Sequence, residues 1–121
     1  MPTLADLDHC TTLIAALLRA STPLPQWCDA QLTVRSSPAD DTRSYEFTYT
    51  LADGTTRRDL SPPVPELSRL SRLVQQHRAI TRGLGQPPWF RMSLRVSHDG
   101  RFEVGFEYRD DYRPGDVVRG A

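Results

Sequence analysis

The stretch Pro87–Asp110, PPWFRMSLRVSHDGRFEVGFEYRD, decides the fold of this chain. Apolar and polar residues alternate on both sides of the segment 98–100, as in strands with one buried and one wet face. The alternating apolar residues are Phe90, Met92, Leu94 and Val96, followed by Phe102, Val104, Phe106 and Tyr108. The stretch therefore predicts one long β-hairpin.

The turn of this hairpin fixes which residues face each other. A two-residue Asp99-Gly100 loop places Val96 opposite Glu103, which mixes apolar and charged residues on one face. A three-residue loop over residues 98–100, with Gly100 in the left-handed region, keeps the two faces distinct. We predict this second register, which pairs Val96 with Phe102, Leu94 with Val104, Arg95 with Glu103, and Arg91 with Glu107.

Two amphipathic helices are expected before the hairpin. Residues 3–20 begin with Thr3 and Asp6 in the positions of a capping box. The apolar row of this helix is Leu4, Leu7, Cys10, Ile14, Leu17 and Leu18. The second helix covers roughly residues 65–82, with Gly83 as its C-terminal cap. Its apolar row is Leu67, Leu70, Val74 and His77, and Arg69, Arg72, Arg78 and Arg82 fall mostly outside it.

Three further strands are expected between the two helices. Residues 30–35 and 45–51 alternate with period two, and Trp27 opens this sheet region. Asp53-Gly54 indicates a two-residue hairpin loop, which places Tyr49 opposite Arg58. The strand after this loop is short and less apolar, so we expect it toward an edge of the sheet.

The expected order is α-β-β-β-α-β-β. Its two helical rows and one apolar sheet face are buried most simply in an α+β two-layer sandwich, with a five-stranded antiparallel sheet and two helices on one face. We expect residues 1–110 to form a single domain and residues 111–121 to be a polar, poorly ordered tail.

Composition narrows the class of protein. The 121 residues suit one domain, and no apolar run reaches the ~20 residues of a membrane span. The acidic N-terminus lacks a secretory signal, so we expect a cytoplasmic protein that does not bind membranes. Cys10 and Cys28 are too few for a disulfide scaffold and are expected to be small buried residues.

No residue pattern in the chain indicates catalysis or a cofactor. The histidines 9, 77 and 98 lack metal-ligand spacing, and Gly83-Leu84-Gly85 lacks the preceding strand and following helix of a phosphate loop. We therefore expect no enzyme activity, no metal and no cofactor.

Nucleic-acid binding is a weaker interpretation. Residues 55–95 carry eight arginines against two acids, including Arg57, Arg58, Arg69, Arg72 and Arg78. However, acidic residues interleave with them and the whole chain has zero net charge, which argues against nucleic acid as a partner.

The sheet face turned away from the helices is polar. We expect it to carry Gln31, Thr33, Arg35, Glu46, Thr48, Thr50, Arg57, Asp59, Arg91, Arg95, Glu103 and Glu107. One interpretation is an ordinary solvated face. The other is a recognition surface, because arginine-rich polar faces on rigid sheets suit docking.

The last third of the chain resembles the YezG-like family of bacterial immunity proteins. The matching residues are Gly85, Pro88-Trp89, the alternating strand to Val96, Asp99-Gly100-Arg101-Phe102 and Phe106-Glu107-Tyr108-Arg109-Asp110. Family members similarly show a glycine, then Pro-Trp, a strand, and a second strand of the form GKF-x-V-x-F-x-Y-x-D. Trp27 and the segment 45–49 look like earlier counterparts, whereas the short third strand and the RPGD tail depart from the family.

The resemblance implies a cytoplasmic immunity protein, or antitoxin, of interbacterial competition. Such a protein binds and occludes a cognate protein toxin, expected here to be a nucleic-acid-targeting or NAD-targeting enzyme. The candidate toxin-binding residues are Asp40, Asp41, Arg91, Arg95, Glu103, Glu107, Asp110 and Asp111. The alternative is a toxin-secretion chaperone or adaptor without inhibitory activity.

Overall fold

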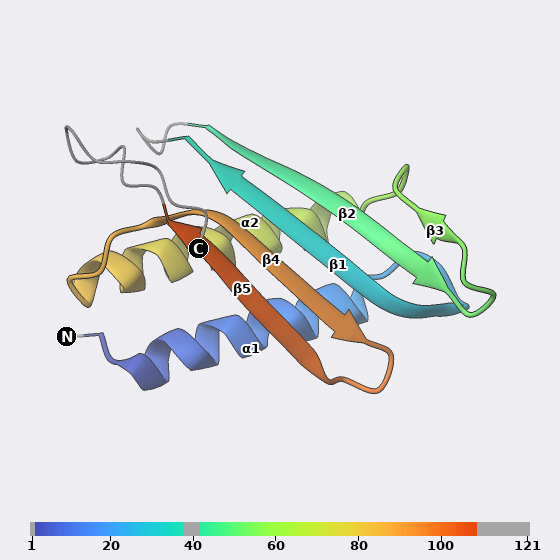
Figure 1. Cartoon of the computed structure of the whole chain (residues 1–121), viewed down its shortest axis with the longest axis horizontal. Coiled ribbons are helices and arrows are strands. Elements are labelled where there is room, and N and C mark those ends of the chain that lie inside the picture. Colours follow the sequence, from blue (N-terminus) through green and yellow to red (C-terminus); the bar gives the residue numbers. More distant parts are fainter. Residues whose placement is uncertain (1, 38–41, 109–121) are drawn as a thin grey trace.

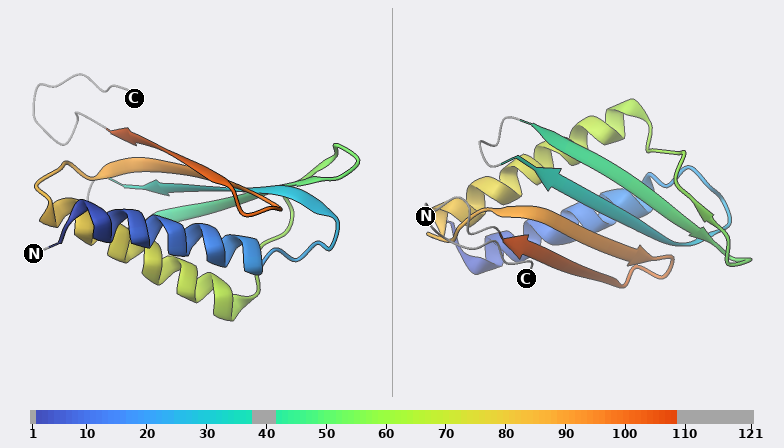
Figure 2. Two further views of the ribbon diagram at one scale, coloured as in Figure 1. Left: turned by 90° about the horizontal axis from the view of Figure 1, so that it is seen from below. Right: turned by 45° about the horizontal axis from the view of Figure 1, so that its top comes forward.

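The structure, a computed structural model, describes residues 2–37 and 42–108. Its elements are α1 (Leu4–Ala20), β1 (Trp27–Ser36), β2 (Arg43–Leu51), β3 (Thr56–Arg57), α2 (Val64–Gly83), β4 (Trp89–Ser97) and β5 (Phe102–Tyr108) (Figure 1). The strands form one antiparallel sheet in the order β3-β2-β1-β4-β5. Both helices lie on one face of this sheet (Figure 2). The predicted α+β sandwich and its element order are confirmed.

The helix α1 begins at the predicted cap. The Asp6 N–H donates to Thr3 Oγ1 at 3.1 Å, and the Thr3 N–H donates to Asp6 Oδ2 at 2.9 Å. These two bonds satisfy backbone donors that the first helical turn leaves free. The buried side of α1 consists of Cys10, Thr11, Ile14, Ala15 and Leu18, whereas Leu4, expected in this row, is exposed. Cys10 is thus buried as predicted, but the prediction is wrong for Cys28 of β1, which is exposed.

The core lies between the helices and the central strands. β1 contributes Ala30, Leu32 and Val34, and β4 contributes Met92, Leu94 and Val96, all of them fully buried. Each large apolar side chain removed from water in this way stabilises the fold by about 1.5–3 kcal/mol.

One prediction about the core is wrong at the start of β4. The pairing of β4 with β5 shifts between Trp89 and Arg91, so an extra residue interrupts the alternation there. As a result Trp89 is fully buried, and Phe90, expected on the apolar face, is only half-buried.

The β4–β5 hairpin has the predicted register. Val96 pairs with Phe102, Leu94 with Val104, Arg95 with Glu103, and Arg91 with Glu107. The loop spans residues 98–100, and Gly100 adopts a φ of 95°, which is the left-handed conformation that this loop requires.

The β2–β3 hairpin differs from the prediction by one residue. Tyr49 pairs with Arg57, and the loop contains three residues, 52–54, with Gly54 at a φ of 90°. The Asp53 carboxylate accepts hydrogen bonds from both the N–H and the hydroxyl of Thr55, which stabilises this longer loop. The strand is otherwise as expected, since β3 is short and lies at the edge of the sheet.

This register also corrects the expected face of Arg57. Arg57 pairs with the buried Tyr49 and so belongs to the helix side of the sheet, because opposed residues share a face. Asp59 lies beyond the end of β3 and forms an ion pair with Arg57 at 2.9 Å. Arg57 is therefore not on the sheet face turned away from the helices, and Asp59 lies outside the strands.

The end of α2 lies one residue beyond the prediction. Gly83 is still helical, the cap is Leu84, and Gly85 takes the left-handed conformation with a φ of 76°. A Cβ atom on Gly83 would lie 2.5 Å from Cγ of Pro2, so this glycine gives room for the N-terminal segment to pack. Gly83 is therefore needed for the close packing of Pro2, and Gly85 for the left-handed turn after the helix.

Candidate protein-binding face

The sheet face opposite the helices is open to solvent in the described part of the chain (Figure 2). Its side chains come from alternate positions of four strands. They are Gln31, Thr33 and Arg35 of β1, Glu46, Thr48 and Thr50 of β2, Arg91, Ser93 and Arg95 of β4, and Glu103, Gly105 and Glu107 of β5. We call this set the open face.

Pairs of opposite charge cross the β4–β5 end of the open face. Arg91 forms an ion pair with Glu107, and both side chains are half-buried. Arg95 lies between two acids, 4.0 Å from Asp29 and 3.9 Å from Glu103. Exposed pairs such as Arg95–Glu103 stabilise a fold by only about 0–1 kcal/mol each. Their main physical effect is to fix a pattern of charge on a rigid surface.

A shallow trough separates these charged pairs. Gly105 pairs with Ser93, and Ser93 also pairs with Thr33, so small side chains follow one another across β5, β4 and β1. A hollow of about 290 Å³ lies beside them, lined by Gln31, Ser93, Leu94, Arg95, Glu103, Val104 and Gly105. A Cβ atom on Gly105 would meet no other atom within 4 Å. The trough therefore has room for a side chain of a partner.

We expect Gly105→Thr to raise the free energy of unfolding by about 0.5–1 kcal/mol, because threonine suits a strand better than glycine does. Gly100→Thr in the same hairpin is the matched control. It should lower the free energy of unfolding by about 1–3 kcal/mol, because Gly100 has a φ of 95°. Urea denaturation of both variants measures the difference. Equal effects at the two positions would contradict this account.

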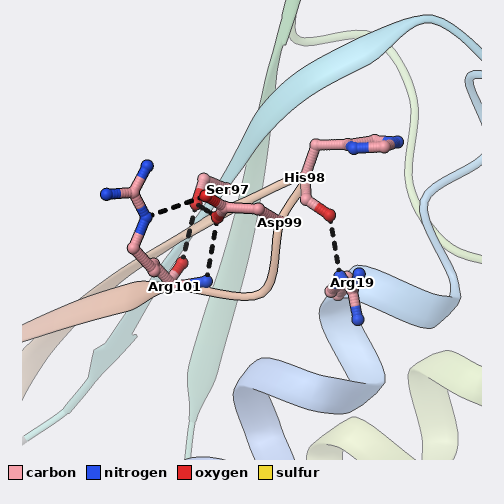
Figure 3. Close-up of polar contacts among 5 residues, drawn as sticks. All are labelled: Arg19, Ser97, His98, Asp99 and Arg101. Carbon is pink, nitrogen blue, oxygen red and sulfur yellow. Dashed lines mark hydrogen bonds and ion pairs between the residues drawn. The ribbon is translucent and has the colours of Figure 1, made fainter.

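The β4–β5 turn is held rigidly at one end of the open face (Figure 3). The Asp99 carboxylate accepts hydrogen bonds from the Ser97 hydroxyl at 2.5 Å, the Arg101 N–H at 3.2 Å and the Arg101 Nε–H at 2.8 Å. These donors, the Ser97 hydroxyl foremost, lower the pKa of Asp99. Arg19 of α1 donates from Nε to the backbone oxygen of His98 at 3.0 Å, which ties the turn to the helix layer.

The structure brings half of the predicted site residues together. Arg91, Arg95, Glu103 and Glu107 are neighbours on the open face, as expected. Asp40, Asp41, Asp110 and Asp111 lie outside the described residues, and so does the expected tail over residues 111–121.

The sequence interpretation missed a polar network in the core. The indole N–H of Trp89 donates to Nδ1 of His77 at 3.3 Å, and Nε2 of His77 lies 3.1 Å from the Thr11 hydroxyl. That hydroxyl donates to the backbone oxygen of Leu7 at 3.0 Å. Because Nδ1 accepts and Thr11 has already given its proton to Leu7, the imidazole is neutral and carries its proton on Nε2.

Arg78, expected outside the apolar row of α2, is also part of this interior. Its guanidinium lies 4.7 Å from the ring centroid of Trp89 and donates to the backbone oxygen of Trp89. The side chain is 1% exposed. Burial, and secondly the charge of Arg78, lowers the pKa of His77 to about 4.

This network links both layers of the sandwich. Phe106 of β5 stacks on His77 with ring centroids 5.2 Å apart, and Thr11, His77 and Trp89 come from α1, α2 and β4. The position of His77 on an apolar helical row was the only sequence signal for it. We interpret this network as the interior contacts that fix the position of the β4–β5 hairpin, whose other side forms part of the open face.

Residues 2–37 and 42–108 contain no group of three or more His, Cys, Asp or Glu residues placed to hold a metal ion. Neither of the two helices has the combined length and apolarity of a membrane-crossing segment. No protein-family model matches the chain. No curated protein sequence matches it either.

Proposed function

We propose that this protein binds a bacterial toxin through the open face and neutralises the toxin by covering its functional surface. The observation that carries the proposal is the pattern of Arg91–Glu107 and Arg95–Glu103 on either side of the Gly105 trough. Alternating charge gives a partner both an orientation and a register, and complementary charge speeds the encounter. The resemblance of residues 85–110 to immunity proteins supports the choice of a toxin as the partner.

Neutralisation in this proposal needs no chemistry from the chain. A rigid sheet that covers the active site of a nucleic-acid-targeting or NAD-targeting toxin blocks substrate access by its volume alone. The anchored β4–β5 turn and the buried network of Trp89 and His77 hold the open face in one conformation. This rigidity lowers the entropy cost of ordering the face on binding.

The direct experiment is co-expression with the protein encoded beside this chain. We expect growth to be rescued and a stable complex to elute from a sizing column. A complex that forms without rescue would support a secretion chaperone or adaptor instead. Neither a complex nor rescue would contradict both functions.

A charge swap tests whether the open face makes the contact. The double variant Arg91→Glu/Glu107→Arg keeps the cross-strand ion pair but inverts the charge pattern that a partner meets. We expect the free energy of unfolding to change by less than about 1 kcal/mol. The dissociation constant of the toxin complex should rise by about 30-fold or more, because inverted charges oppose their former partners.

The control for this swap is Arg72→Glu on the exposed side of α2, in the helix layer. It changes the net charge but leaves the open face intact, so binding should remain near wild type. Equal weakening by the control and by the swap would show that binding does not depend on the charge pattern of the open face, and would contradict a specific face.

A further inference from the structure

The strand β5 forms one edge of the sheet. No strand in the described residues pairs with its outer side. At the opposite edge of the sheet, β3 has two residues and covers only the end of β2, whereas β5 has seven residues. Exposed edges of this length are commonly blocked by proline, lysine or a covering loop, and β5 contains neither proline nor lysine.

The hydrogen bonds of the hairpin show which backbone groups face outward. The N–H of Ser97 donates to the oxygen of Arg101 at 2.8 Å, so this pair bonds within the hairpin. Bonded and non-bonded pairs alternate along an antiparallel ladder. The backbone groups of residues 103, 105 and 107 therefore point to β4, and those of residues 102, 104 and 106 point away from the sheet.

The side chains of these outward-facing positions are apolar. Phe102 is 38% exposed, and Val104 and Phe106 pack only partly against the core. The apolar side of the sheet thus continues to its edge and ends without full cover in the described part of the chain. A strand added to this edge would complete both the hydrogen bonds and the apolar cover.

We propose that the added strand is β5 of a second copy of this chain, paired antiparallel about a two-fold axis at Val104. Residues that lie the same number of positions before and after Val104 then face each other along the whole interface. Phe102 faces Phe106 of the second copy, Val104 faces Val104, and Arg101 faces Glu107. Aromatic and opposite-charge pairs of this kind each stabilise a sheet by roughly 0.2–1 kcal/mol.

Other two-fold registers fit less well. An axis at Gly105 opposes Glu103 with Glu107, and an axis at Glu103 opposes two copies of that acid, so each brings like charges together. An axis at Phe106 leaves the exposed Phe102 beyond the last residue of the opposing strand. Only the axis at Val104 pairs Phe102, Val104 and Phe106 with one another and opposes no like charges.

The resulting dimer has a ten-stranded sheet. A two-fold axis perpendicular to the sheet keeps both helix layers on one side and both open faces on the other. This inference does not depend on the proposed function, because it rests on the backbone edge of β5 and on the apolar residues on its helix side.

Engineered cysteines test the register. In a Cys28→Ser background, which removes the exposed thiol, Val104→Cys should form a disulfide between copies under mild oxidation. Directly opposed Cα atoms lie about 5.5 Å apart, within the reach of a disulfide. Gly105→Cys is the matched control, because its two copies are offset by two residues and lie about 8 Å apart.

We expect wild-type protein at high micromolar concentration to have the mass of two 13.7 kDa chains by light scattering. Val104→Pro removes an outward N–H but no bond to β4, so it should be monomeric, and Val104→Ala should stay dimeric. Circular dichroism checks that both variants fold. A monomeric wild type would overturn the proposal, and so would a disulfide that forms at Gly105→Cys but not at Val104→Cys.

Discussion

Trp89→Ala should lower the free energy of unfolding by about 3–5 kcal/mol, the largest effect we expect from one substitution. The side chain is fully buried, stacks under Arg78 and donates its indole N–H to His77. Its loss opens a cavity, leaves Nδ1 of His77 without its donor and removes the ring that the Arg78 guanidinium packs on. Urea denaturation followed by circular dichroism measures the change.

Trp89→Phe separates the two contributions. Phenylalanine keeps most of the ring but cannot donate to Nδ1 of His77, so about 1–3 kcal/mol should be lost. Phe90→Ala, at the half-buried neighbouring position, is the control and should cost less than Trp89→Ala. If Phe90→Ala costs more, the assignment of Trp89 to the core is wrong.

The second large effect is a dependence of stability on pH that originates in His77. The folded protein holds the pKa of this imidazole at about 4, against the usual 6.5. Between these values the unfolded chain binds a proton that the folded chain does not, so lowering the pH favours unfolding. The free energy of unfolding should fall by up to about 3 kcal/mol as the pH drops from 6.5 to 4. Above pH 6.5 this contribution should be constant.

His77→Gln separates the contribution of His77 from that of the carboxylates, which titrate in a similar pH range. The glutamine amide can still donate to Thr11 but does not titrate, so the variant should lack this part of the pH dependence. The difference in the free energy of unfolding between wild type and variant should therefore change by up to about 3 kcal/mol between pH 6.5 and 4. His9→Gln, on the exposed side of α1, should leave the wild-type pH profile unchanged. A His77→Gln profile parallel to that of wild type would contradict the buried neutral imidazole.

The register of the β4–β5 hairpin could be predicted from the sequence because many side-chain pairs fit only one register. The apolar pairs and the pairs Arg91–Glu107 and Arg95–Glu103 agree only with a three-residue loop. The β2–β3 hairpin offered no such test, since β3 has two residues and few side chains to match. Asp53-Gly54 alone fits loops of two or three residues, and the Asp53–Thr55 bonds select the longer one.

The buried polar network around His77 could not be predicted from the periodicity of apolar residues within single helices or strands. Helical spacing places Arg78 beside the apolar row of α2, but its burial depends on Trp89, which arrives from β4. The bulge that turns Trp89 inward depends in turn on the pairing with β5. The open face was predictable for the opposite reason, because membership of a sheet face follows from period two alone.

The separation of the two sheet faces has a consequence for how this protein can diversify. In β1, in β4 beyond its bulge and in β5, even-numbered residues such as Leu32, Leu94 and Val104 build the interior, and odd-numbered ones such as Arg95 and Glu103 face the solvent. Substitutions at the odd-numbered positions can therefore change the partner that the protein binds, while the core residues at the even-numbered positions stay the same.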